Sequence, residues 1–122
     1  MLFYCGNVKR KFVIMDYKTL LIEYFEAFNL KDLTKLKALL HPDVVLDDWE
    51  CNVSGRDAVL LLANKSFEEF PRLALKVKKL LIDGQHASVE IELQLSSDLF
   101  LEVVDTFVFL DEKIVSIKAF KK

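Results

Sequence analysis

One acidic residue interrupts an apolar row near the C-terminal end of the chain. In an extended strand, alternate residues share a face. One face of the segment 99–110 carries five large apolar side chains and one acid: Leu99, Leu101, Val103, Asp105, Phe107 and Phe109. Burying an unpaired carboxylate costs on the order of several kcal/mol, so Asp105 needs a hydrogen-bond donor or takes up a proton. An acid of this kind is a candidate for proton chemistry in a pocket, whereas an acid bonded to a hydroxyl, an N–H or a lysine only holds the fold.

Two further polar residues fall on faces that should point inward. Tyr24 lies on the apolar stripe of an expected helix, where its hydroxyl would need a partner. Asp48 shares one face of an expected strand with Val44 and Leu46. Each has a simpler interpretation: Tyr24 as a core tyrosine, and Asp48 as an exposed acid at a strand end. A phenol and two carboxylates on inward faces of three elements nevertheless predict a shared functional site.

The N-terminal half predicts three helices that would position these groups. The first begins after Asp16 as N-cap and repeats apolar residues at helical spacing: Tyr17, Leu20, Leu21, Tyr24, Phe25 and Phe28. The second begins at Asp32, with four leucines inward, and ends before Pro42: Leu33, Leu36, Leu39 and Leu40. The third follows a capping box with Ser54 as N-cap and ends at Pro71. Its inner face would carry Val59, Leu62, Ala63, Phe67 and Phe70.

Strands account for most of the remaining chain. A short strand is expected at 44–49, followed by a connector at 51–54. Four strands in a meander are expected at 73–78, 89–96, 99–110 and 114–120, because apolar and polar residues alternate there or turn residues bound them. The order helix, helix, strand, helix and four strands predicts an α+β domain with a curved antiparallel sheet.

Composition narrows the classes of function. The chain has 122 residues with a formal net charge of −2, which gives no electrostatic reason to expect nucleic acid or a membrane as partner. No apolar run approaches the roughly 18 residues of a membrane span. Neither the two cysteines nor His41 and His86 have metal-ligand spacing, and no glycine-rich phosphate loop is present. We therefore expect a cytoplasmic protein that uses no metal and no cofactor.

The first 15 residues precede the first expected helix. The apolar block at 2–5 is too short for a signal peptide, and the basic cluster follows it. Met15 directly precedes the first expected helix and could be the native start. We expect residues 1–15 to form an N-terminal arm and residues 16–122 to form one domain.

The motifs around the candidate residues resemble the nuclear transport factor 2-like superfamily, and within it the SnoaL-like and ketosteroid-isomerase-like branch. The resemblance rests on the segments 24–33, 41–48, 55–59, 103–107 and 111–117. It implies a cystatin-like cone in which three N-terminal helices pack on a curved antiparallel sheet of mixed strand order.

The resemblance also implies roles for three residues. Tyr24 matches the oxyanion-binding tyrosine of the isomerase, Asp48 the aspartate that moves the proton, and Asp105 the protonated aspartate of the oxyanion hole. This predicts proton abstraction beside a carbonyl, with Tyr24 and Asp105 stabilising the dienolate oxygen. We expect a small hydrophobic molecule as ligand, bound by Phe25, Trp49, Phe67, Val103 and Phe107 in addition to the catalytic residues.

Two functions remain open from the sequence. The first is an enzyme of the isomerase, cyclase or lyase kind acting on a hydrophobic carbonyl compound. The second is a non-catalytic domain of the same fold that binds a ligand or assembles. The other face of the segment 99–110 is itself largely apolar, with Phe100, Val104, Val108 and Leu110 beside Glu102 and Thr106, and such a face should not remain in water. We therefore expect a homodimer through the sheet.

Overall fold

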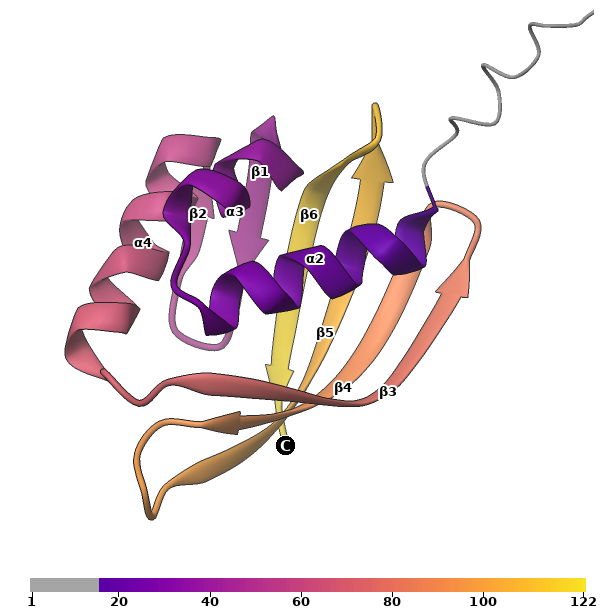
Figure 1. Cartoon of the computed structure of the whole chain (residues 1–122). Helices are drawn as coiled ribbons and strands as arrows, with labels where there is room; N and C mark the ends of the chain where they lie inside the picture. The colour runs from indigo at the N-terminus through magenta and orange to yellow at the C-terminus, as the bar shows by residue number, and fades with distance from the viewer. Residues whose placement is uncertain (1–15) are drawn as a thin grey trace, which may run out of the picture.

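Three helices and six strands make up the part of the chain that the computed structural model describes, residues 16–122 (Figure 1). In chain order they are α2 (Tyr17–Asn29), α3 (Leu33–Leu39), β1 (Leu40–Asp47), β2 (Asn52–Ser54), α4 (Arg56–Glu69), β3 (Ala74–Asp83), β4 (His86–Gln94), β5 (Phe100–Leu110) and β6 (Lys113–Lys121). The α+β class expected from the sequence is confirmed. The arm expected at residues 1–15 lies outside the described residues.

The six strands form one curved sheet with the order β2-β1-β6-β5-β4-β3. All neighbouring pairs are antiparallel except β1 and β6, which run parallel. The sheet is therefore mixed and not wholly antiparallel, because the first strand of the fold lies beside the last. Helix α2 crosses the concave face, and α3 and α4 lie beside the β1–β2 end (Figure 1).

The expected helix starts are confirmed at two positions and wrong at the third. The carboxylates of Asp16 and Asp32 accept hydrogen bonds from backbone N–H groups of the first turns of α2 and α3, at 3.1 and 3.0 Å. Helix α4 instead begins after Gly55, whose φ of 95° suits glycine and which gives no side-chain cap. Ser54 belongs to the edge strand β2, so the expected capping box does not form.

Several strand boundaries differ from the sequence expectation. The strands expected at 73–78 and 89–96 are β3 (Ala74–Asp83) and β4 (His86–Gln94), and both run closer to the turn between them than expected. Strand β1 begins at Leu40, directly after α3, and ends at Asp47, so it is displaced from the expected range 44–49. Residues 52–54, expected to be a connector, form the short strand β2 beside the end of β1. The expected turn at Asp83 and Gly84 is confirmed, with Gly84 at φ 60°, and the four later strands follow in the predicted order.

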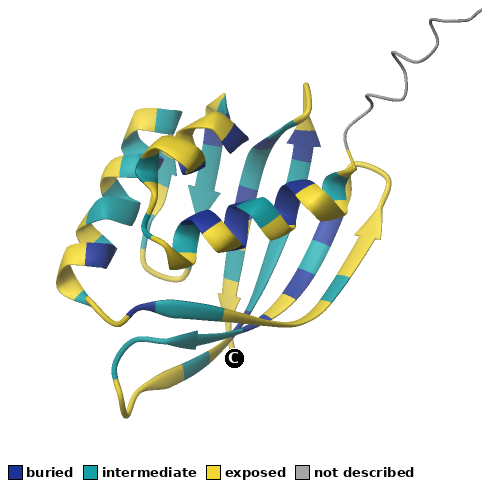
Figure 2. Ribbon diagram, viewed as in Figure 1, coloured by how far each residue is buried: buried dark blue, intermediate teal, exposed yellow. Residues whose placement is uncertain are grey.

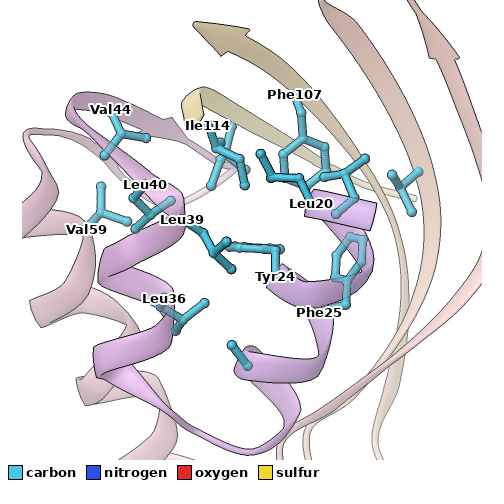
Figure 3. Packing of buried hydrophobic residues seen from close by; sticks show 14 of the residues in the cluster. Leu20, Tyr24, Phe25, Leu36, Leu39, Leu40, Val44, Val59, Phe107 and Ile114 are labelled. Atoms are coloured by element: carbon cyan, nitrogen blue, oxygen red, sulfur yellow. The ribbon is translucent and has the colours of Figure 1, made fainter. Parts of the chain in front are cut away.

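The hydrophobic core lies between α2 and the concave face of the sheet. Leu20, Leu21 and Phe25 of α2 are buried there, together with Phe107 of β5 and Ile114 of β6 (Figures 2 and 3). Burying large side chains of this kind contributes about 1.5–3 kcal/mol each. Helix α4 contributes Val59 and Phe67 to the same core, whereas its other inward residues stay half-buried. That half of the concave face is less completely filled, and a cavity lies there.

Candidate functional site

A cavity of about 410 Å³ lies between α2, α4 and the concave face of the sheet. This volume is within the range of small-molecule sites. Its walls are mainly apolar and come from α2 and α4, from β1, and from β3 to β6 with the loops that flank them: Phe28, Leu46, Val59, Leu62, Ala63, Phe70, Leu73, Leu75, Ile91, Leu93, Leu95, Leu99, Leu101, Val103, Ile117 and Ala119. The polar and aromatic groups in the lining are Tyr24, Asp48, Trp49, Glu50, Cys51, Ser66, Asp105 and Lys121.

Tyr24 presents a phenol to this cavity from the middle of α2. Its ring is buried and meets Phe25 and Phe107 edge to face, with centroids 5.3 and 5.7 Å apart, which fixes the orientation of the ring. Among the hydrogen bonds of residues 16–122, none involves its hydroxyl. Burial, and secondarily the charge of Asp105, raises the pKa of Tyr24 far above its ordinary value. The phenol therefore stays protonated and can donate a hydrogen bond to a ligand.

Asp105 lies in the centre of β5, between Val89 of β4 and Ala119 of β6. Its side chain is half-buried, and no hydroxyl, N–H or lysine of residues 16–122 forms a hydrogen bond with its carboxyl group. Burial, and secondarily the charge of Asp48, raises its pKa to about 7. A protonated carboxylic acid is thus well populated near neutral pH. The structure does not support the alternative of an acid bonded only to hold the fold.

Asp48 reaches the cavity from a turn, and the expectation that it extends strand β1 is wrong. One of its carboxylate oxygens, Oδ1, accepts hydrogen bonds from the backbone N–H groups of Glu50 and Cys51, both at 2.8 Å. Its own N–H donates to the carbonyl of Cys51 at 2.9 Å. These local bonds replace strand pairing and hold the carboxylate in one orientation. The second oxygen, Oδ2, accepts no bond from a backbone N–H of residues 16–122, and the Cys51 thiol is a side-chain hydrogen-bond partner of the Asp48 carboxylate.

Strand register brings the two acids to the same level of the sheet. Asp47, the last residue of β1, lies opposite Lys118 of β6, so Asp48 lies near the level of Ala119. Ala119 is the partner of Asp105 in β5. Two strand spacings, about 10 Å, separate the backbones, and the alanine between them leaves room for a ligand. The effect of Asp48 on the pKa of Asp105 agrees with this placement.

The five residues predicted to bind a ligand divide into two groups. Trp49 and Val103 line the cavity, and Trp49 is 39% exposed, so it lies at the mouth and does not plug the cavity. Phe25, Phe67 and Phe107 are not in the lining and pack within the core. Phe25 and Phe107 meet edge to face with centroids 5.9 Å apart. Their rings fill space that the sequence alone could not distinguish from a pocket.

Sequence reasoning did not select several residues of the site. Ala119 and Lys121 follow Ile117 on the inner face of β6, and the period-2 pattern of that strand could have indicated them. Cys51 lies beside Asp48, and burial together with the neighbouring Asp48 and Glu50 raises the pKa of its thiol. The thiol is therefore protonated and not an activated nucleophile.

The wall of the cavity at the β3 edge of the sheet is anchored by the end of α2. The amide side chain of Asn29 donates to the carbonyl of Leu75 at 2.9 Å and accepts from the N–H of the same residue at 2.7 Å. Lys31 adds a bond from Nζ to the carbonyl of Leu73 at 3.1 Å. Asn29 thus acts as a partner for the free edge of β3 and fixes Leu73 and Leu75 at the cavity wall.

No group of three or more His, Cys, Asp or Glu side chains in residues 16–122 is arranged to hold a metal ion. In the same range, no helix is long and apolar enough to cross a bilayer.

The chain belongs to the SnoaL-like domain family, whose model matches residues 21–117. Among solved structures, it is similar to a "putative ketosteroid isomerase" from Kribbella flavida, with 27% identity, a TM-score of 0.76, and coverage of 85% of this chain and 76% of the other. A "putative polyketide cyclase" from Sinorhizobium meliloti is 19% identical with a TM-score of 0.77, covering 83% and 93%. No curated protein matches the sequence.

The expected cone-shaped fold is confirmed by a third structure. A protein "of unknown function with cystatin-like fold" from Xanthomonas campestris has a TM-score of 0.79 at 20% identity, covering 88% of this chain and 91% of the other. The family and fold expected from the sequence are therefore correct.

Proposed function

We propose that this protein binds a small apolar carbonyl compound and moves a proton at the carbon beside the carbonyl, in an isomerase, cyclase or lyase reaction. The observation that carries the proposal is the pairing of Tyr24 and Asp105 at one cavity. Both are hydrogen-bond donors near neutral pH, and neither is bonded to residues 16–122. Donors left free in an apolar wall favour a ligand oxygen as their partner.

In the proposed step, the carbonyl oxygen accepts hydrogen bonds from Tyr24 and the protonated Asp105. Oδ2 of Asp48 removes a proton from the neighbouring carbon, and the electron pair moves onto the oxygen as an enolate. The two donors stabilise that negative charge, which develops in a site with few competing water molecules. Asp48 then returns the proton to a different carbon, which completes an isomerisation without any redox partner.

The differing environments of the two acids support this division of roles. Asp48 accepts two backbone N–H bonds, whereas Asp105 has an apolar surrounding and a raised pKa. A site with one proton acceptor and one neutral acid is what enolate chemistry requires. The name of the Kribbella flavida protein is consistent with such chemistry.

The test is exchange of hydrogen for deuterium beside a carbonyl, which does not require the natural substrate. We expect the protein to accelerate exchange at C1 of 2-tetralone in D₂O, followed by proton NMR. Asp48→Asn should lower the protein-dependent rate about 100-fold or more, and Tyr24→Phe about 10-fold or more. Asp47→Asn, the adjacent acid, is the matched control and should keep the rate. Exchange that is absent, or unaffected by Asp48→Asn, would reject the proposed chemistry.

One observation favours assembly as a second property of the domain. The convex face of the sheet exposes Phe100, Leu110 and Phe120, the last of them 56% exposed. Val104 and Val108 lie between Phe100 and Leu110 on β5 and are half-buried. We propose that this face is the interface of a homodimer, since monomers rarely expose so many large apolar side chains together. A non-catalytic ligand-binding dimer is the alternative function if the exchange test fails.

A further inference from the structure

We propose that Lys121 is a specificity-determining residue at the mouth of the cavity, where it binds an anionic group, such as a carboxylate, on an otherwise apolar carbonyl ligand. The inference deepens the proposed function and rests on it. It names a class of ligand that is amphipathic, with the carbonyl at Tyr24 and Asp105 and the charged group near solvent.

Lys121 faces the cavity because of its place on β6. It follows Ile117 and Ala119 at intervals of two residues, and all three line the cavity. It lies opposite Val103 of β5, one step along the sheet from the pair formed by Asp105 and Ala119. The strand rise separates the two levels by roughly 7 Å along the strand. A ligand that reaches Asp105 can therefore extend to Lys121.

The ammonium group of Lys121 is held in front of an aromatic ring. Its Nζ is 5.7 Å from the centroid of Trp49. Among the described residues that line the cavity, it is the single cation, and no carboxylate of residues 16–122 forms an ion pair with it. The adjacent Lys122 differs, because it points to the other face and pairs with Glu102 at 3.0 Å.

The position of the cation decides which part of the ligand it would bind. Trp49, Glu50 and Lys121 are all exposed, so this end of the cavity meets solvent. An anionic group at this end keeps part of its hydration, whereas the same group deep in the cavity would lose it at high cost. The nearby carboxylates of Asp48 and Glu50 weaken the attraction of Lys121 for an anion. An uncharged ligand, in turn, would leave Lys121 with no counter-ion.

The test compares two ligands that differ by one carboxylate: 2-acetonaphthone and 6-acetyl-2-naphthoate. Binding is measured by isothermal titration at pH 6 in low salt, with the full-length protein. We expect the carboxylate compound to bind the unaltered protein roughly fivefold more tightly, a preference that salt reduces. Lys121→Met should remove the preference, so that the two compounds bind this variant with equal affinity. Lys122→Met is the matched control and should keep the preference.

Three other results would overturn the inference. If the unaltered protein binds both compounds with equal affinity, and Lys121→Met changes neither affinity, the role of Lys121 is rejected. The proposed carbonyl site is not affected by that result. A preference that survives Lys121→Met would also reject it. If neither compound binds, the carbonyl site itself fails, and this inference falls with it.

Discussion

The raised pKa of Asp105 predicts that this residue destabilises the folded protein at alkaline pH, and that Asp105→Asn removes the effect. The folded pKa of about 7 is higher than the ordinary aspartate pKa of 3.8, so the folded state holds the proton more tightly than the unfolded state. Stability is therefore fully present below about pH 4 and is lost as the pH rises to about 7. Asparagine has nearly the same shape as aspartic acid and does not ionise. The Asp105→Asn protein should therefore not lose stability through ionisation at this position between pH 4 and pH 7.

The magnitude follows from the pKa difference. Each pKa unit corresponds to 1.36 kcal/mol, so the full penalty above pH 7 is about 4 kcal/mol. Between pH 5 and pH 8 the penalty grows by about 3 kcal/mol. Because the side chain is only half-buried, solvent reduces this number, and we expect a measured change of about 1–2 kcal/mol. The change is measured as the difference between the variant and the unaltered protein.

The assay is urea unfolding at pH 5 and pH 8, followed by circular dichroism with the slopes compared between proteins. Asp105→Asn should gain stability relative to the unaltered protein on going from pH 5 to pH 8. Asp43→Asn, at an exposed position on β1, is the matched control and should show less than about 0.5 kcal/mol of change. A pH-independent difference for Asp105→Asn would refute the reasoning, because Asp105 would then titrate alike in both states.

Four further predictions follow from the structure. Affinity for the neutral ketone 2-acetonaphthone should fall as the pH rises through about 7, where Asp105 loses its proton, and titration calorimetry showing a flat profile would contradict this. Phe107→Ala should lower the free energy of unfolding by about 3–5 kcal/mol in urea melts, since the ring is fully buried, while Leu99→Ala at the exposed rim should change it little. Asn29→Ala should lower it by about 1–2 kcal/mol through loss of the two bonds to Leu75, with exposed Glu26→Ala as control. Size-exclusion chromatography with light scattering should show a dimer at micromolar concentration, and Phe120→Glu should give a monomer.

The parts of the fold set by local periodicity could be predicted from the sequence. Helical spacing placed Leu20, Leu21 and Phe25 on the buried side of α2, and alternation placed Asp105 on the concave face of β5. Aspartates before apolar stripes predicted two helix starts, because a carboxylate satisfies free N–H groups of the first turn. These signals involve residues close in sequence, so a single chain contains them.

The remaining features depend on contacts between distant segments or on competing local bonds. Asp48 was placed on a strand, but its bonds to two backbone N–H groups form a turn that alternation does not reveal. Phe107 shares a face with Asp105, yet it fills the core because α2 crosses over it. An apolar residue of the sheet belongs to the core where a helix packs tightly over it, and to the cavity wall where the helix packs less tightly. Helix α4 packs less tightly over its part of the sheet than α2 does.

The proposed chemistry depends most directly on the protonation of Asp105, which NMR can measure. Carbon-detected titration of side-chain carboxyl groups, with Asp105→Asn to assign the signal, gives the pKa of this one residue. We expect a midpoint of about 7, which moves lower in Asp48→Asn because the neighbouring negative charge is removed. A midpoint near 4 that does not respond to Asp48→Asn would mean an ordinary solvated acid and would contradict the proposed site.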